Sequence, residues 1–86
     1  ASALNDEEAL VESGRYVAAY IGDKLRRADT GEYSMSDDEL NAMIIRLSAF
    51  EIRLRELEGG NDTRARDVTE TITRTMEQAQ AIANKR

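Results

Sequence analysis

The chain has 86 residues, with 17 acidic and 12 basic side chains, a formal net charge of −5, and no histidine, cysteine, proline or tryptophan. Without histidine and cysteine, the common zinc ligand sets and the Ser-His and Cys-His catalytic pairs cannot be built. The excess of acid disfavours a general nucleic-acid binder, which needs a concentrated basic surface. No apolar run approaches the ~18 residues of a membrane span, and no signal-peptide pattern is expected.

These counts predict a single domain over residues 1–86 that is cytoplasmic and uses neither a cofactor nor a metal. A domain near this size buries only about 60% of its unfolded surface, so its stability is small. Small domains are often stabilised by disulfides, metals or a partner subunit. Because this chain cannot form disulfides or the usual zinc sites, we expect it to associate, as a homodimer or as a subunit of a larger complex.

The first helix is predicted over residues 6–28. Asn5 is a candidate N-cap, and Asp6, Glu7 and Glu8 place negative charge at the positive end of the helix dipole. Apolar or small residues recur at helical spacing and predict the buried face. They are Leu10, Gly14, Val17, Ile21, Leu25 and Ala28, and Ala18 widens this face.

Two features of this segment need a separate explanation. Gly14 costs roughly 1 kcal/mol relative to alanine inside a helix, which predicts close approach by a neighbouring helix; a tolerated weak point is the alternative. Tyr16 and Tyr20 are four residues apart and share one flank. Packing at the edge of the core is the plain interpretation, and contact with a partner protein is the alternative, because tyrosine is common at interfaces.

The second helix is predicted over residues 36–58 and begins with a capping box. In this motif the Ser36 oxygen accepts from the backbone N–H of Glu39, and the Glu39 side chain reaches back to the start of the helix. Met35 and Leu40 are placed to form the accompanying hydrophobic staple. A heptad pattern follows and predicts the core face of the helix. Its members are Leu40, Met43, Leu47, Phe50, Leu54 and Leu57.

The second helix also carries apolar residues on another side. Ile45, Ala49 and Ile52 form a second apolar row. A helix that is apolar on two sides is either central in a bundle or shared between its own core and an interface. We predict the shared arrangement, in which these three residues contact another subunit; burial within a single small bundle is the alternative.

The third helix is predicted over residues 62–84, although residues 68–75 alternate like a strand, with threonine at every odd position. β-branched residues favour strands. No other segment supplies a partner strand, and residues 76–81 strongly favour helix, so we predict helix throughout. The expected buried face is Ala65, Val68, Ile72, Thr75, Ala79 and Ile82.

Three amphipathic helices joined through residues 29–34 and 59–61 predict an all-α fold. The expected architecture is a three-helix antiparallel bundle, or a helical hairpin with a third helix, completed by dimerisation.

Charged clusters supply few candidate sites. The acids at 6–8 and 37–39 begin helices, where the dipole explains them without a metal. Arg64 and Arg66 begin the third helix, where cations oppose the dipole. A salt bridge to the acidic end of the second helix is the plain explanation, and contact with an anion or an acidic partner is the alternative.

The predicted function is therefore protein–protein interaction, of a regulatory, adaptor or inhibitor type, by a homodimer or with another protein. We expect no enzymatic activity and no partnership with membranes, nucleic acid or small molecules. Two alternatives stay open. One is a small bacterial or phage regulator of transcription or biofilm type that associates with DNA directly or indirectly, and the other is a small all-helical enzyme that uses arginines and carboxylates.

Overall fold

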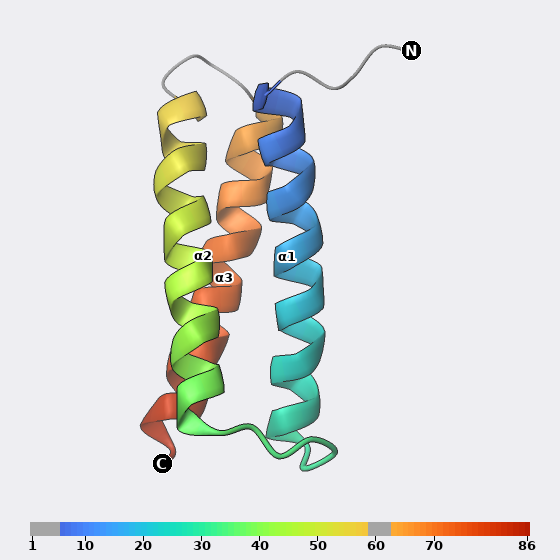
Figure 1. Ribbon diagram of the computed structural model, residues 1–86, viewed down its shortest axis with the longest axis vertical. Helices are drawn as coiled ribbons and strands as arrows, with labels where there is room; N and C mark the ends of the chain where they lie inside the picture. Colours follow the sequence, from blue (N-terminus) through green and yellow to red (C-terminus); the bar gives the residue numbers. More distant parts are fainter. Residues whose placement is uncertain (1–5, 59–62) are drawn as a thin grey trace.

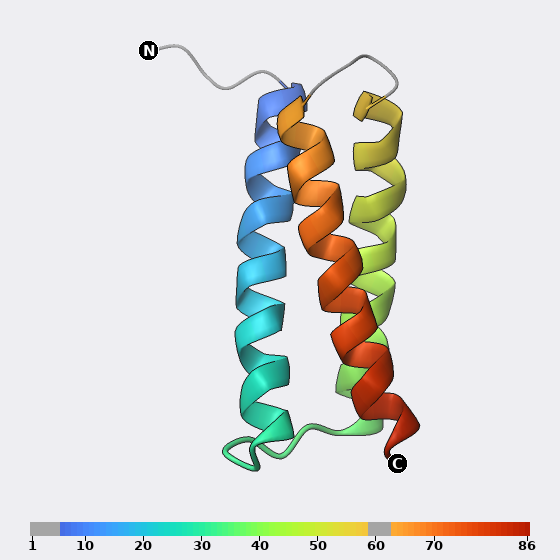
Figure 2. The same ribbon diagram turned by 180° about the vertical axis from the view of Figure 1, so that it is seen from behind.

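A computed structural model describes residues 6–58 and 63–86 and consists of three helices. They are α1 (Asp6–Asp29), α2 (Asp37–Glu58) and α3 (Thr63–Asn84). α2 runs antiparallel to α1, and α3 runs antiparallel to α2 and lies behind the other two (Figure 1). Seen from the opposite side, α3 lies in front of the other two helices and runs from the α1 side at the top to the α2 side at the bottom (Figure 2). The all-α prediction is confirmed for the described residues.

None of the three described helices combines the length and the apolar character needed to cross a membrane. The predicted N-cap Asn5 and the predicted loop at residues 59–61 lie outside the described residues.

The loop after α1 is built around Gly31, whose φ of +85° lies in the left-handed region that favours glycine. The amide of Thr30 donates to the carbonyl oxygen of Arg26 at 3.1 Å, and the amide of Glu32 donates to that of Arg27 at 2.9 Å. These bonds satisfy carbonyl groups at the end of α1 and terminate the helix.

At the start of α2, one half of the predicted capping box is present. The Glu39 amide donates to the Ser36 Oγ at 3.1 Å, as predicted. The prediction that the Glu39 side chain reaches back is wrong. Its carboxylate instead accepts the Tyr33 hydroxyl, with O···O distances of 2.7 and 2.6 Å. A hydrogen bond from a phenol to a carboxylate is charge-assisted and therefore strong, so it competes well with a backbone amide.

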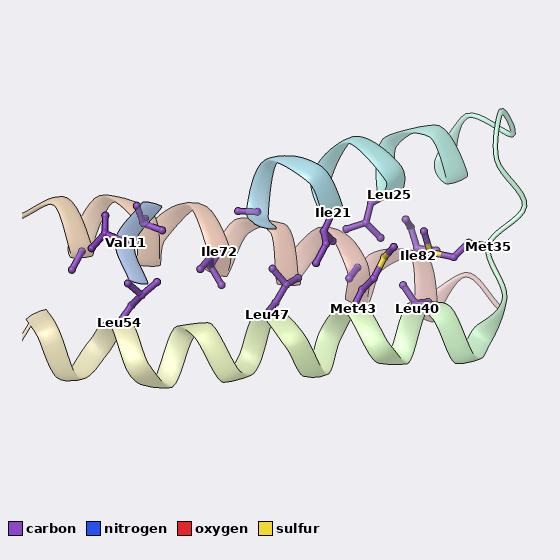
Figure 3. Close-up of a cluster of buried hydrophobic side chains, with 14 residues drawn as sticks. Val11, Ile21, Leu25, Met35, Leu40, Met43, Leu47, Leu54, Ile72 and Ile82 are labelled. Carbon is purple, nitrogen blue, oxygen red and sulfur yellow. The ribbon is translucent and has the colours of Figure 1, made fainter. Parts of the chain in front are cut away.

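The core is one continuous cluster between the three helices, much of it visible in Figure 3. Its buried members are Val11, Ala18, Ile21, Leu25, Met35, Leu40, Met43, Leu47, Leu54, Ala65, Val68, Ile72, Ala79 and Ile82. All six residues predicted for the buried face of α3 are buried. In α2, Phe50 and Leu57 are half-buried and pack against the cluster.

The predicted buried face of α1 needs a correction. Gly14, Ala18, Ile21 and Leu25 are buried as predicted. Val11, which was not predicted, is also buried, whereas Leu10 and Val17 are only half-buried. Leu10 instead lines a groove with Phe50 of α2. The correction therefore concerns the first half of α1, where the inward face is centred nearer Val11 than Leu10, because α1 must cover both α2 and α3.

Gly14 marks the close approach that its position predicted. A Cβ atom at this position would lie 3.1 Å from Leu54 Cδ1, 3.2 Å from Val68 Cγ1 and 3.5 Å from Phe50 Cδ1. Side chains from α2 and α3 thus converge on α1 at Gly14. Because glycine has no side chain, they can approach the helix this closely.

The threonine-rich part of α3 is helical, as predicted. Thr69 and Thr75 are buried, and their hydroxyls donate to the carbonyl oxygens of Ala65 and Thr71, at 2.7 and 2.8 Å. Each threonine thus satisfies its own polar atom one turn back along the helix. This bond is what allows β-branched polar residues to replace hydrophobic ones in the buried face.

Candidate protein-binding face

The side of α2 turned away from the core is apolar. Ile45 and Ile52 are 69% and 62% exposed, and Ala42 and Ala49 are also exposed. These four residues follow steps of three, four and three, so they form one line along the helix. We call this line, Ala42, Ile45, Ala49 and Ile52, the outer strip.

The outer strip and the core face lie on opposite sides of the same helix. Ile45 precedes the fully buried Leu47 by two positions, and Ile52 precedes the fully buried Leu54 by two positions. Two positions correspond to about 200° of rotation around an α-helix. The structure therefore places the predicted residues Ile45, Ala49 and Ile52 on the surface of the single chain. Ala42 was not predicted, although the same heptad spacing identifies it.

Arginines border the outer strip on the α1 side. Arg46 lines a groove with Tyr20 and Ala42, and Arg53 lines a second groove with Leu10. Apolar patches with arginine and tyrosine at their edge have the composition of protein interfaces.

Only one of the two predicted tyrosines is shown beside the outer strip. Tyr20 is 48% exposed and shares a groove with Ala42. Tyr16 is 72% exposed and lies one turn earlier on α1, and it is not part of that groove lining. The edge-of-core interpretation is therefore wrong for Tyr16, since most of its side chain faces away from the bundle.

A polar cluster closes the same groove at the loop end of the bundle. The Lys24 Nζ lies 5.2 Å from the Tyr20 ring centroid and 5.1 Å from the Tyr33 ring centroid. It is also 3.6 Å from Glu39 Oε2. Cation–π and ionic contacts thus hold Lys24 between α1, the loop and α2.

These contacts shift two titrations in the same direction. Hydrogen bonding to Glu39 is the main cause that raises the pKa of Tyr33 above its ordinary value. Hydrogen bonding to Tyr20 is the main cause that raises the pKa of Lys24. The sequence pattern did not predict this cluster. The spacing of Tyr20 and Lys24 was a usable signal, but nothing in the sequence indicated that Tyr33 folds back onto them.

The two arginines predicted to contact an anion or partner are separated by the fold. Arg66 lines a groove of about 520 Å³ between α2 and α3, together with Arg55 and Arg74. Arg64 is not among the lining residues. Residues two apart on a helix point in different directions, which explains the separation. Glu70 lies among the three arginines, so the groove is mixed in charge.

No group of three or more acidic side chains in the described ranges, 6–58 and 63–86, is arranged to hold a metal ion. The acids of the first turns of α1 and α2 lie at helix starts, where the dipole accounts for them.

The chain matches no protein-family model, and it has no significant match among curated proteins or solved structures.

Proposed function

We propose that this protein is a small regulatory, adaptor or inhibitor-type module that acts by burying the outer strip against another protein chain, and that it forms a homodimer. The exposure of Ile45 and Ile52 carries the proposal. These two large aliphatic side chains lie on a helix whose opposite face already supplies the core, so they do not contribute to the core of the single chain.

The size of the outer strip sets the strength of the complex. A fully buried large aliphatic side chain contributes roughly 1.5–3 kcal/mol. Because Ile45 and Ile52 are only about two-thirds exposed, two isoleucines from each of two copies would supply roughly 4–8 kcal/mol, against an association cost of about 4–15 kcal/mol. The net free energy is small, so we expect a reversible complex in which Tyr20 and the flanking arginines add contacts.

The proposal includes no catalytic role. The groove lined by Arg55, Arg66 and Arg74 favours a second candidate, a regulator that associates with DNA or another polyanion. Glu70 in that groove and the net charge of −5 both oppose phosphate binding. Protein binding through the outer strip is therefore the better-supported function.

Paired substitutions on α2 test the assignment of its two faces. Ile52→Asp is expected to weaken association and to leave helicity intact, because Ile52 is 62% exposed. Leu47→Asp is expected to unfold the chain, because Leu47 is fully buried and an unpaired charge there is costly. Sedimentation velocity measures association, and far-UV circular dichroism measures helicity.

Ala19→Asp is the matched control, since it adds the same charge at an exposed position of α1. It should leave association unchanged. A wild-type protein that sediments as a monomer at high micromolar concentration overturns the homodimer. Unfolding by both Ile52→Asp and Leu47→Asp overturns the assignment of two faces.

A further inference from the structure

Large and small side chains alternate along the outer strip. Ala42 and Ala49 are seven residues apart, and so are Ile45 and Ile52. In heptad terms the alanines occupy one of the two seam positions and the isoleucines occupy the other. This alternation determines the shape of the partner surface that can pack against the outer strip.

We infer that the outer strip docks on the outer strip of a second copy of this chain, with the two α2 helices antiparallel. The inference rests on the proposed function and specifies its partner and its geometry. A two-fold axis that crosses the outer strip at the level of Leu47 generates the pairing, since Leu47 lies midway along the chain between Ala42 and Ile52. The Leu47 side chain itself points to the opposite side of the helix, into the core. α2 spans Asp37–Glu58, so this axis also lies at the middle of the helix, and the two helices overlap along their whole length.

The antiparallel arrangement fits each isoleucine against an alanine. Ala42 faces Ile52 of the second copy, and Ile45 faces Ala49 of the second copy; the symmetry repeats both pairs. Facing positions that combine one large and one small residue interdigitate without voids or overlap. Four such layers then cover the exposed surface of Ile45 and Ile52.

A parallel arrangement of the same strips packs less well. Equivalent residues then face one another, so Ala42 meets Ala42 and Ile45 meets Ile45. The isoleucine layers then hold the helices apart and the alanine layers leave a gap, whereas closer approach to fill that gap would overpack the isoleucine layers. Both a void and an overpacked layer are destabilising.

The charges beside the outer strip give a second argument. Antiparallel pairing sets the two helix dipoles in opposite directions. It also brings Arg53 of the second copy towards Glu39, twice by symmetry, although the Glu39 carboxylate already accepts the Tyr33 hydroxyl and pairs with Lys24, so this added attraction is small. Like charges also meet, at Arg46 beside the axis and between Asp38 and Glu56 at the ends. Glu39, Arg46 and Arg53 lie at the edge of the contact, where exposed ion pairs contribute little. Asp38 and Glu56 continue the spacing of the outer strip at its two ends, so their repulsion opposes both arrangements. Parallel pairing keeps like charges at Asp38 and Glu56 and loses the attraction of Glu39 to Arg53.

Because the chain contains no cysteine, single-cysteine variants can report the geometry directly. Ala42→Cys and Ile52→Cys are purified separately, mixed, and equilibrated in a glutathione redox buffer at a protein concentration at which the wild type is dimeric. Antiparallel docking predicts that the mixed disulfide dominates and that each variant alone forms none above background. Mass spectrometry separates the three products, since the two variants differ in mass.

Ala19→Cys, exposed on α1, gives the background of collisional disulfides. Ala49→Cys mixed with Ile45→Cys is the second pair, in case one substitution weakens the contact. Dominant disulfides within each single variant overturn the antiparallel geometry but leave the proposed function standing. A dimer that forms no disulfide above background at either pair overturns docking through the outer strip. A monomeric wild type overturns both this inference and the homodimer.

Discussion

Gly14 lies at the point where side chains from α2 and α3 converge on α1, and Gly22 offers a comparison. A Cβ at Gly14 would come within 3.1 Å of Leu54, whereas a Cβ at Gly22 would meet nothing within 4 Å. Replacing glycine by alanine within a helix gains roughly 1 kcal/mol from propensity. We therefore expect Gly22→Ala to stabilise the chain by about that amount. Gly14→Ala should gain clearly less, because Leu54 and Val68 must move aside.

Urea unfolding of both variants, followed by circular dichroism, gives the two free energies of unfolding. Gly14→Val extends the series, because overpacking a close contact costs typically about 1–3 kcal/mol. Equal stabilisation by Gly14→Ala and Gly22→Ala would contradict the close approach at Gly14.

Tyr33 and Lys24 together predict how stability depends on pH. Hydrogen bonding to Glu39 raises the pKa of Tyr33, and hydrogen bonding to Tyr20 raises that of Lys24. A group whose folded pKa lies above its unfolded pKa stabilises the fold fully below the unfolded value. That contribution is lost as the pH rises through the folded value. The free energy of unfolding should therefore be flat near neutrality with respect to these groups and fall above about pH 10.

Tyr33→Phe isolates the tyrosine contribution to this effect. The variant keeps the ring beside Lys24 but removes the hydroxyl that donates to Glu39. Its stability should be lower than that of the wild type at pH 8 and should fall less steeply between pH 9.5 and 11. Identical pH profiles for the two proteins would show that the Tyr33–Glu39 bond does not contribute to folding.

At the level of the helices, periodicity was sufficient to predict α2 and α3. The heptad pattern of α2 identified Leu47 and Leu54 as core, and both are fully buried. For α3, the sequence predicted helix despite the β-branched residues at 68–75, because no other segment had a pattern suited to pair with them as a strand. The threonine hydroxyls then bond one turn back along the helix. Both outcomes follow from local chemistry that can be read along a single segment.

The position of α1 in the bundle could not be predicted in the same way. Its apolar residues cover a wide arc, so the sequence did not determine whether Leu10 or Val11 points inward. The choice depends on where α2 and α3 lie relative to α1, and Val11 is the one that is buried. Tyr33 is a comparable case, because its bond to Glu39 joins a loop to a helix and leaves no periodic signal.

The outer strip could be predicted only in part. Its existence follows from spacing, and the structure shows Ile45 and Ile52 exposed. The molecule that covers it cannot be read from one chain's own contacts. What the alternation of alanine and isoleucine can specify is the shape of the surface that fits, which is the basis for inferring a second copy.

The charge of the whole molecule distinguishes self-association from binding to a polyanion. Each copy carries a net charge of −5, so two copies repel one another at long range. Salt screens this repulsion, with a Debye length of about 10 Å at 0.1 M. Contact between apolar strips is not weakened by screening. Self-association should therefore strengthen as the salt concentration rises from about 50 to 300 mM.

Binding of DNA through the groove of Arg55, Arg66 and Arg74 has the opposite salt dependence, because phosphate contacts release counterions and weaken steeply with salt. Sedimentation of the wild type at several salt concentrations, together with retention on a DNA column, measures both effects. Ile52→Asp should lose the salt-enhanced association, whereas Arg66→Gln should keep it. Salt-sensitive DNA retention that Arg66→Gln abolishes, combined with a monomeric wild type at every salt concentration, would replace the outer strip with the arginine groove as the functional surface.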